Sequence, residues 1–500
     1  MLNFENKKLF LYEVDPLFFY DFDNDGFGDF KGFLKKISYF DFLNIDGIVF
    51  PDIFNQENTI LKNVNLSIFD KYGKMKDLKK IVDSLTKNNK ELFVELNLEN
   101  ILNSMIIKKT IDDFQSNDIK KYIVEKNKIN NNIFKWDSNE KRKAFEHIIN
   151  FWKKINVNNV ILTNFEFLYQ KNNHLDHDLL DQLKILYSIA KEINKDIKIG
   201  LKSMFFSEKT VNLIFKKYIY KICDFYIDCS YSLISTNKKY PFDIIEKFDP
   251  KKLYKKIKKI SIHPSLKSKY FISLNNNKIG KVNSRWLDEN NLINESNKSL
   301  LLFSTLSPYS SINYYGDELG LLRLKINNKY DYQDFEYNEN KTKFNFKKNK
   351  IQLFEYSQKY LSRINNQSIF IWNKETNGGF SKNDNIFRKL PINWKTHNLK
   401  TQYFDDNSIV SFYKKIIEFS EQQINFKIKI KKNIINKKLF ILKWKSLDNS
   451  ILIIINLSNE TINKKISKKY KIIFSTCVNK NYEKGIKVLA PYESLVLVNN

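Results

Sequence analysis

Short apolar runs alternate with amphipathic segments through the first two-thirds of this 500-residue chain. Eight of the runs have the length and the β-branched or aromatic content of buried strands. These runs lie at 9–14, 47–53, 92–98, 159–164, 198–203, 225–230, 270–276 and 311–316. Between them, segments such as 74–89 and 139–156 repeat apolar residues at the spacing of one helix face. Eight strands, each followed by a helix, predict an α/β fold: a (β/α)8 TIM barrel over residues 1–98 and 139–420.

Two stretches depart from this alternation. The connection at 99–138 is lysine-rich and longer than a strand-to-helix loop requires, so we expect a short inserted subdomain after the third strand. From 421 to 500 the helical pattern gives way to short alternating apolar and polar runs separated by turn residues. That pattern predicts a C-terminal antiparallel β-sandwich.

Composition narrows the class of protein. With 42% hydrophobic and 15% aromatic residues, the chain can bury a large core, which argues against disorder. Its three cysteines, Cys223, Cys229 and Cys477, have no metal-binding spacing and form no disulfide framework. The first residues contain no long apolar segment of the secretory kind. These features favour the cytoplasm, and because no run of about 18 apolar residues occurs, we expect no membrane span.

The net charge of +28 comes from 84 basic and 56 acidic residues. Taken alone, it suggests nucleic acid or an anionic membrane surface as a partner. However, the lysines spread over every expected helix instead of forming one stripe, and no nucleic-acid-binding motif is present. Lysine, asparagine and isoleucine are abundant while glycine and proline are scarce, as coding bias in an AT-rich genome would produce. We therefore interpret the charge as compositional and do not expect nucleic acid as a partner.

An acidic run, DFDNDGFGDF at 21–30, has the oxygen spacing of a calcium-binding loop. The expected ligands, at loop positions 1, 3, 5, 7 and 9, are Asp21, Asp23, Asp25, the Phe27 carbonyl oxygen and Asp29. Gly26 supplies the sharp turn midway, but Gly32 stands where a helix–loop–helix site would have a bidentate glutamate. The loop should therefore join a strand to a helix. A solvated acidic turn is the alternative interpretation.

Six segments, in their order along the chain, resemble glycoside hydrolase family 13 and, within it, the oligo-1,6-glucosidase and trehalose-6-phosphate hydrolase group. They are DFDNDGFGDFKG (21–32), KYGKMKDLKKIVDSLTKNNKELFVEL (71–96), FKWDSNEKRKAFEHIINFWKKINVNNV (134–160), YYGDELGL (314–321), WNKETNGGFS (372–381) and LAPYESLVLV (489–498). The resemblance implies the same barrel and C-terminal domain, a structural Ca²⁺ in the first loop, and a role in the metabolism of α-glucosides.

The same resemblance places the family's catalytic groups on three strands. Its nucleophilic aspartate would end the fourth strand, its acid/base glutamate the fifth, and a third carboxylate would follow the seventh. This chain has Thr163, Leu201 and Lys278 at those positions. A retaining glycosidase needs two carboxyl groups facing each other across the sugar. Leucine cannot protonate a leaving oxygen, and threonine without a base is a poor nucleophile. The resemblance therefore favours a non-catalytic, sugar-binding or scaffolding member of the family, with a glucoside or a protein as its partner.

Two alternatives stay open. An active α-glucosidase could use unconventional carboxylates, since Glu166 lies three residues past Thr163 and Glu95 keeps an acid on the third strand, ahead of Glu99 and Asn100. In the second alternative the cleft binds an anion such as a phosphosugar, because three lysines fall near the strand ends that would meet the sugar. These lysines are Lys202, Lys278 and Lys281. Lysines fixed by coding bias are the competing explanation for them.

Overall fold

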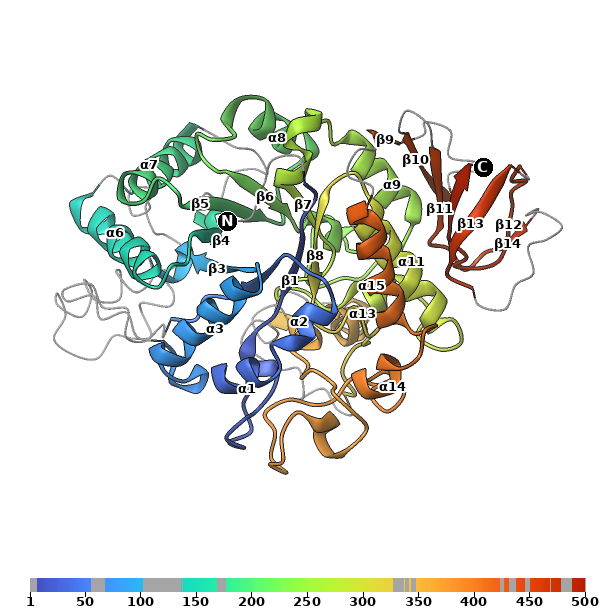
Figure 1. The fold of residues 1–500 in the computed structure, drawn as a ribbon, viewed down its shortest axis with the longest axis horizontal. Helices are drawn as coiled ribbons and strands as arrows, with labels where there is room; N and C mark the ends of the chain where they lie inside the picture. The colour runs from blue at the N-terminus through green and yellow to red at the C-terminus, as the bar shows by residue number, and fades with distance from the viewer. Residues whose placement is uncertain are drawn as a thin grey trace. The chain divides into compact units, whose positions relative to one another are not determined.

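The computed structural model (Figure 1) describes most of the chain. The described residues are 7–54, 68–101, 136, 138–168, 177–326, 337, 341–342, 348–422, 427–430, 438–445, 450–467, 469–477 and 488–499. Most of the expected inserted subdomain, 102–135 with residue 137, lies outside these ranges. The chain divides into two compact units, Gly47–Ile227 with the first two residues, and Asn3–Asp46 with Asp228–Asn500.

Eight parallel strands close into a barrel in the order of the sequence, which confirms the predicted TIM barrel. The strands are β1 (Phe10–Glu13), β2 (Gly47–Phe50), β3 (Glu91–Asn97), β4 (Asn159–Thr163), β5 (Lys198–Ser203), β6 (Phe225–Asp228), β7 (Tyr270–Ser273) and β8 (Ser310–Tyr314). Each strand overlaps one of the eight apolar runs identified in the sequence. All residues of β1, β2 and β4 are buried, as expected of parallel strands that are covered on both faces.

In the unit formed by Gly47–Ile227, helices alternate with strands β2 to β6. The helices are α3 (Met75–Lys87), α6 (Asn139–Lys154), α7 (His177–Ile193) and α8 (Glu208–Leu213). Helix α3 buries Leu78, Ile81, Val82 and Leu85, which share one face because they are three or four residues apart. Helices α6 and α7 lie side by side outside β3, β4 and β5 (Figure 1). The helical pattern in the sequence therefore records which face of each helix covers the barrel.

The register of the strands brings chemistry-bearing positions to one end of this unit. Glu95 of β3 is the partner of Ile161 on β4, which is in turn the partner of Gly200 on β5. Gly200 is required by packing, because an added Cβ would overlap the ring of Phe225 on β6. The residues that follow these partners, toward the carboxyl ends of the strands, are the ones that reach the barrel mouth in this fold.

The second unit contains β1, β7, β8 and the remaining helices. These are α1 (Phe30–Lys35), α2 (Ser38–Phe42), α9 (Pro250–Lys259), α10 (Val282–Trp286), α11 (Ile293–Leu306), α13 (Lys348–Leu361), α14 (Leu399–Tyr403) and α15 (Ile409–Gln422). Helix α9 begins at a proline after the N-cap Asp249, whose side chain accepts a hydrogen bond from the Lys251 N–H. Tyr254 of this helix stacks on Phe440, 5.2 Å between centroids, and so packs α9 against the C-terminal sheet.

The C-terminal region is antiparallel, as expected. Its strands are β9 (Lys427–Ile430), β10 (Leu439–Lys445), β11 (Ser450–Asn456), β12 (Ile462–Asn463), β13 (Tyr470–Ser475), β14 (Val488–Leu489) and β15 (Leu495–Asn499). Five of them form one sheet in the order β13-β15-β11-β10-β9, and β12 pairs with β14. Ile462 and Leu489 of the small sheet share one hydrophobic cluster with Leu439, Ile454 and Leu497 of the large sheet. The two sheets thus enclose a core of their own.

Candidate functional site

The structure places the three family positions as follows. Thr163 ends β4, is buried, and its Oγ1 donates a hydrogen bond to the Leu96 carbonyl at 3.4 Å. Leu201 lies within β5 and is fully buried. Lys278 lies in the loop after β7, where its N–H donates to Asn276 Oδ1 at 2.9 Å. Neither Thr163 nor Leu201 has an ionisable side chain, so neither can act as acid, base or anionic nucleophile.

One acid on β3 is held by a lysine on β5. Lys202 Nζ lies 2.5 Å from Glu95 Oε1, and both side chains are buried. Each partner thereby supplies the counter-charge that burial of the other requires. Lys202 follows directly after Leu201, so β5 supplies a counter-charge for the acid on β3. Sequence reasoning named both residues but did not pair them.

Glu166, the other candidate for an unconventional catalytic acid, caps the end of β5. It lies in a short 3-10 helix, Phe165–Leu168, and its Oε1 accepts the Met204 N–H at 2.9 Å. Burial raises the pKa of Glu166, while hydrogen bonds from Ser203 and Met204 favour the ionised form. This carboxylate is therefore committed to the backbone after β5.

Asp52 is a functional candidate that sequence reasoning missed. It comes directly after β2, and its carboxyl oxygens accept the N–H groups of Phe54 and Asn97, each at 3.2 Å. Burial raises the pKa of Asp52 to about 7, and the charge of Glu95 adds to the increase. Its signal in the sequence was an acid at the carboxyl end of a barrel strand, the end at which this fold builds its sites.

Asn164, directly after β4, makes a further polar contact in this unit. Its Nδ2 donates to Glu99 Oε2 at 3.3 Å, while Asn97 Oδ1 accepts the N–H groups of Glu99 and Asn100. Every acid named so far in this unit therefore accepts a hydrogen bond or pairs with a lysine. The arrangement can bind hydroxyl groups through the remaining lone pairs, but its described carboxylates are already engaged.

In the second unit, the carboxyl end of β6 bears Asp228, a fully buried acid. Its Oδ2 accepts the Tyr270 hydroxyl at 2.7 Å, and its Oδ1 accepts the Ser230 N–H at 2.9 Å. The Tyr270 hydroxyl also lies 3.2 Å from that of Tyr231. Asp228 thus joins the carboxyl end of β6 to Tyr270 at the start of β7 and, through it, to Tyr231.

Lys281 and Asp317 form another buried pair in this unit. Lys281 Nζ is 3.7 Å from Asp317 Oδ1 and donates to the Tyr315 carbonyl at 3.3 Å, and both Asp317 oxygens accept Asn275 Nδ2 at 2.9 Å. Burial lowers the pKa of Lys281 and raises that of Asp317. Lys281 and Lys202 therefore each lie against a carboxylate, which weakens the expectation of an anion site built from the two of them and Lys278.

The acidic loop at 21–29 gathers three of its four carboxylates. One oxygen each from Asp21, Asp23 and Asp29 lies within 4.8 Å of the others, whereas Asp25 is not in this group. Gly26 has φ +95°, which gives the sharp turn. An added Cβ at Gly32 would overlap the Tyr20 carbonyl oxygen, so a twelfth-position glutamate could not stand there. Three carboxylates fit a hard cation that prefers oxygen ligands.

The same carboxylates also hold the backbone of their own loop. Asp21 accepts the N–H groups of Asn24 and Gly26 at 2.7 and 2.9 Å and the Ser381 hydroxyl at 2.6 Å. Asp29 caps helix α1 by accepting the Gly32 N–H at 2.8 Å. Lone pairs remain on each carboxylate for a cation, since every oxygen can accept more than one bond.

The fold and these strand ends define the class of protein. The alpha-amylase catalytic-domain family model matches residues 114–427, which is more than half of the chain. The chain therefore belongs to the alpha-amylase family, glycoside hydrolase family 13. An oligo-1,6-glucosidase from Parageobacillus thermoglucosidasius is 22% identical over 491 residues, and the match covers 83% of each protein. Other α-glucosidases match over shorter stretches, and the chain spans about a quarter (27%) of the length of one of them.

Solved structures agree on the fold. The trehalose-6-phosphate hydrolase of Bacillus licheniformis superposes with a TM-score of 0.79 at 17% identity, covering 99% of this chain and all of that one. A mutant of the enzyme MutB in complex with its substrate sucrose has a TM-score of 0.81 at 16% identity, covering 98% and 99%. At these identities the likeness establishes the barrel and the C-terminal sheet.

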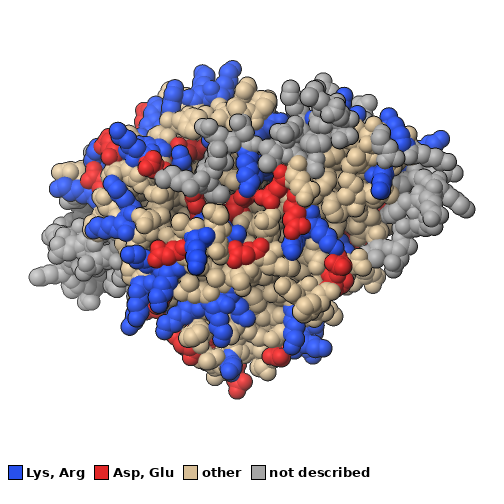
Figure 2. All heavy atoms as spheres, in the orientation of Figure 1, with Lys and Arg blue, Asp and Glu red and all other residues tan. Residues whose placement is uncertain are grey.

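Basic and acidic side chains both occur on the face of the molecule that Figure 2 shows. In Figure 2 basic side chains are spread across the visible face and mixed with acidic ones, rather than gathered along one element. Among the helices that the structure describes, none combines the length and hydrophobicity required to cross a bilayer.

Proposed function

We propose that this member of the alpha-amylase family binds an α-glucoside at the barrel mouth without hydrolysing it. The observation that carries the proposal is that Thr163, Leu201 and Lys278 stand where the resemblance would place the family's three chemistry-bearing groups. Leu201 is fully buried, so a side chain of this kind supplies packing where an acid/base would have to exchange a proton. Loss of one catalytic group costs a thousandfold or so, and groups that act as a unit leave no useful partial activity.

The acids near these positions already form an ion pair or hydrogen bonds within the protein, which supports the same proposal. Glu95 is neutralised by Lys202, and Glu166 accepts backbone and side-chain hydrogen bonds at the end of β5. Carboxylates in this state still accept hydrogen bonds from sugar hydroxyls. Relatives in this family include enzymes that act on glucosides, and a structural neighbour was solved with sucrose. A neutral glucoside is therefore the ligand we expect.

The test is a paired measurement of binding and turnover. Purified protein is titrated calorimetrically with maltose, isomaltose, trehalose and trehalose 6-phosphate, and each mixture is assayed for released glucose. We expect binding of at least one of them with no release above the rate without protein. Turnover that disappears in Glu95→Gln or Asp52→Asn, with the fold intact by circular dichroism, would overturn the non-catalytic proposal. If none of the four sugars binds, the proposal that the protein binds an α-glucoside is wrong.

One observation favours a second candidate, an active glucosidase with relocated carboxyl groups. Asp52 has a pKa of about 7 and Glu95 is held by a lysine, so the environments of two neighbouring acids differ in the way an acid/base pair requires. This candidate predicts a covalent adduct with a mechanism-based glucosidase inhibitor. Mass spectrometry locating the label on Glu95 would establish it, and an unlabelled protein after full incubation would exclude it.

The proposal includes one Ca²⁺ held by the 21–29 loop. Asp21, Asp23 and Asp29 would supply carboxylate oxygens. The ion would neutralise part of their negative charge and stabilise the loop between β1 and α1. Support comes from the convergence of these three oxygens and from Gly26. Calcium bound to the folded state alone raises the melting temperature by mass action. A melting temperature that is the same in EDTA and in millimolar calcium would contradict this assignment.

A further inference from the structure

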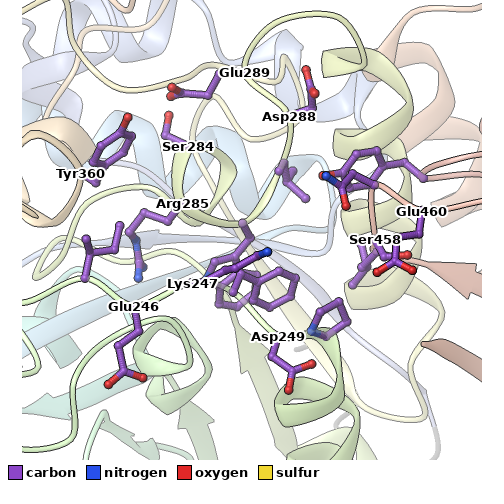
Figure 3. A pocket seen from close by; sticks show the side chains of 18 of the residues that line it. Glu246, Lys247, Asp249, Ser284, Arg285, Asp288, Glu289, Tyr360, Ser458 and Glu460 are labelled. Atoms are coloured by element: carbon purple, nitrogen blue, oxygen red, sulfur yellow. The ribbon is translucent and has the colours of Figure 1, made fainter. Parts of the chain in front are cut away.

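The unit that contains the C-terminal sheet has a cavity whose lining includes no residue of the barrel strands. It has a volume of about 900 Å³, in the range of ~300–1,000 Å³ typical of small-molecule sites. Its walls come from residues before and at the start of α9, from α10 and the loop after it, from α13, and from the 457–460 loop. Figure 3 shows these side chains surrounding the opening. None of the residues at the three family positions lines it.

One wall is an apolar stripe on α13. Leu353, Tyr356 and Tyr360 are three and four residues apart, so they share one helix face. Leu353 is 44% and Tyr356 52% exposed, which is unusual for such large side chains on a helix of the fold. The rings of Tyr356 and Tyr360 lie 5.6 Å apart. The Arg323 guanidinium lies over the Tyr360 ring, 5.2 Å from its centroid, so Tyr356 is the aromatic side chain of this stripe that remains half exposed beside the cavity.

A second aromatic surface is rigid. Phe248 stacks on Trp286 with 4.6 Å between centroids and 5° between planes. The Trp286 Nε1–H donates to Ser235 Oγ at 2.9 Å, so the indole is fixed from behind. Because both flat surfaces are present before any ligand arrives, binding would cost little side-chain ordering.

The polar lining is close to electrically neutral. It holds five acidic and four basic side chains, and the acids are already engaged by protein groups. Glu289 pairs with Arg323 at 3.2 Å, Glu246 with Lys252 at 3.2 Å, and Glu460 with Lys438. Asp249 and Asp288 accept backbone N–H groups of their own turns. Lys247 and Lys251 lie within electrostatic reach of Glu460, so acidic and basic groups offset one another in this lining.

Arg285 does not convert the cavity into an anion site. Its guanidinium is buried and donates to the Gly280 carbonyl, Ser235 Oγ and the Ser232 carbonyl at 2.8–2.9 Å. Each of its three nitrogens thereby donates to an oxygen in the segments that follow β6 and β7. Phosphate recognition normally employs a guanidinium with free, forked donors.

Neutral ligands with both apolar faces and many hydroxyl groups fit such a lining best. The C–H faces of a pyranose can pack on the rings of Tyr356 and Phe248, while its hydroxyl groups exchange hydrogen bonds with engaged carboxylates that keep free lone pairs. We propose that this cavity is a binding site for a neutral oligosaccharide, separate from the barrel mouth. The choice of a saccharide rests on the proposed function, but the site itself does not use the mouth residues.

Stoichiometry separates the two proposals. Maltotriose is titrated into the full chain by calorimetry, and we expect two sites per molecule. Tyr356→Ala should remove one of them or weaken it at least tenfold, since half of this side chain is already exposed and the fold should tolerate its loss. Phe404→Ala is the matched control, because Phe404 is an 88% exposed aromatic outside the cavity lining, and it should leave both sites intact.

Each outcome decides between the sites. Two sites in the wild type and one in Tyr356→Ala support both proposals. One site that Tyr356→Ala abolishes supports the cavity and overturns binding at the mouth. Sites that are all unaffected by Tyr356→Ala overturn the cavity and leave the mouth standing, and absence of any maltotriose binding overturns the cavity proposal. Glu460→Gln gives an independent variant, expected to weaken the same site without altering the other.

Discussion

The carboxyl end of β5 and the turn after β8 occupy equivalent places in a barrel, yet their polar groups do opposite things. After β8, Glu318 is fully buried and accepts hydrogen bonds from Tyr12, Tyr39 and Asn313 at 2.7, 2.8 and 3.0 Å. On β5, Leu201 carries no polar group, and Lys202 forms an ion pair with Glu95. The turn after β8 thus has a buried acid that accepts three hydrogen bonds, whereas β5 has a hydrocarbon side chain followed by a lysine.

The difference teaches which part of a family pattern constrains structure. The segment containing Glu318 is among those that carry the resemblance, and its side chain fastens β1, α2 and β8 to one another. Thr163 ends β4 and Leu201 lies on β5, and the two strands pair in register with these residues in place. The barrel therefore closes with a threonine and a leucine at these positions, so that fold and function must be argued separately.

Removal of the Glu318 carboxylate should have the largest effect. Glu318→Ala leaves three buried donors without an acceptor, each costing about 1–3 kcal/mol, and opens a cavity. We expect the free energy of unfolding to fall by about 5 kcal/mol in urea titrations. Glu375→Ala, at an exposed acid, should change it by less than about 0.5 kcal/mol. If Glu318→Ala lowers the free energy of unfolding by less than about 1 kcal/mol, the Glu318 carboxylate does not hold β1, α2 and β8 together as described.

Lys202→Met tests the β5 side. It leaves Glu95 buried without its counter-charge, and breaking such a pair costs about 3–5 kcal/mol. The double variant Lys202→Met/Glu95→Gln removes both charges and should recover most of the loss. We expect about 4 kcal/mol for the single variant in the same urea titration. If the double variant is no more stable than the single one, the pair does not neutralise Glu95 as described.

The pH dependence of stability should come mainly from buried acids whose pKa is raised. Burial raises the pKa of Glu318 to about 7, above its value of 4.5 in the unfolded chain. The folded state therefore holds this proton more tightly, and its contribution to stability is full below pH 4.5 and lost as the pH rises toward 7. The shift corresponds to roughly 3 kcal/mol. Urea titrations at pH 5 and 7.5 should show this decrease, and Glu318→Gln should flatten it.

Asp52 should add to the same trend, because its pKa is also raised to about 7. Asp52→Asn should therefore flatten the profile in part, while Glu375→Gln should leave it unchanged. A stability that increases between pH 5 and 7.5 in all of these proteins would show that other groups dominate, and that neither acid is neutral in the folded chain.

Much of the fold could be predicted from periodicity, because each barrel strand is a short apolar run and each helix has one buried face. Strand ends were less certain: β7 ends at Ser273, before the expected end at 276, where Asn275 and Asn276 turn toward side-chain hydrogen bonds. Local pattern records burial, but it does not record where polar side chains begin to compete with the strand ladder.

The candidate site was predicted only in outline. The sequence placed Glu95 on the third expected strand and Leu201 on the fifth. It could not show that Lys202 on β5 reaches Glu95 on β3, with β4 between the two strands. That contact joins residues 107 positions apart in the chain. The pKa of Asp52 depends on burial by several segments, which no local pattern contains. The cavity beside α13 was missed for the same reason, since its walls come from four distant parts of the chain.

A substitution at Gly200 tests the packing of β5, with a smaller expected loss of stability. Gly200→Ala places a methyl group against the Phe225 ring, and such overpacking typically costs 1–3 kcal/mol. We expect a loss of about 2 kcal/mol in unfolding free energy, with the change recovered in part by Gly200→Ala/Phe225→Leu. An unchanged stability in the single variant would mean that β5 and β6 can separate freely. In that event the glycine before Leu201 would be a vestige of the family pattern rather than a packing requirement.

Calcium binding to the 21–29 loop should change the stability least. The experiment tests whether the acidic residues of this first barrel loop, like Glu318, stabilise the fold. At a calcium concentration about tenfold above the dissociation constant, binding should add about 1 kcal/mol and raise the melting temperature by a degree or two. Asp23→Asn should abolish this response because Asp23 is one of the three converging carboxylates. Asp25→Asn is the matched control: Asp25 is equally exposed in the same loop, but it is not part of that group. Equal responses in the two variants would mean that the geometry of the loop does not select the ligands.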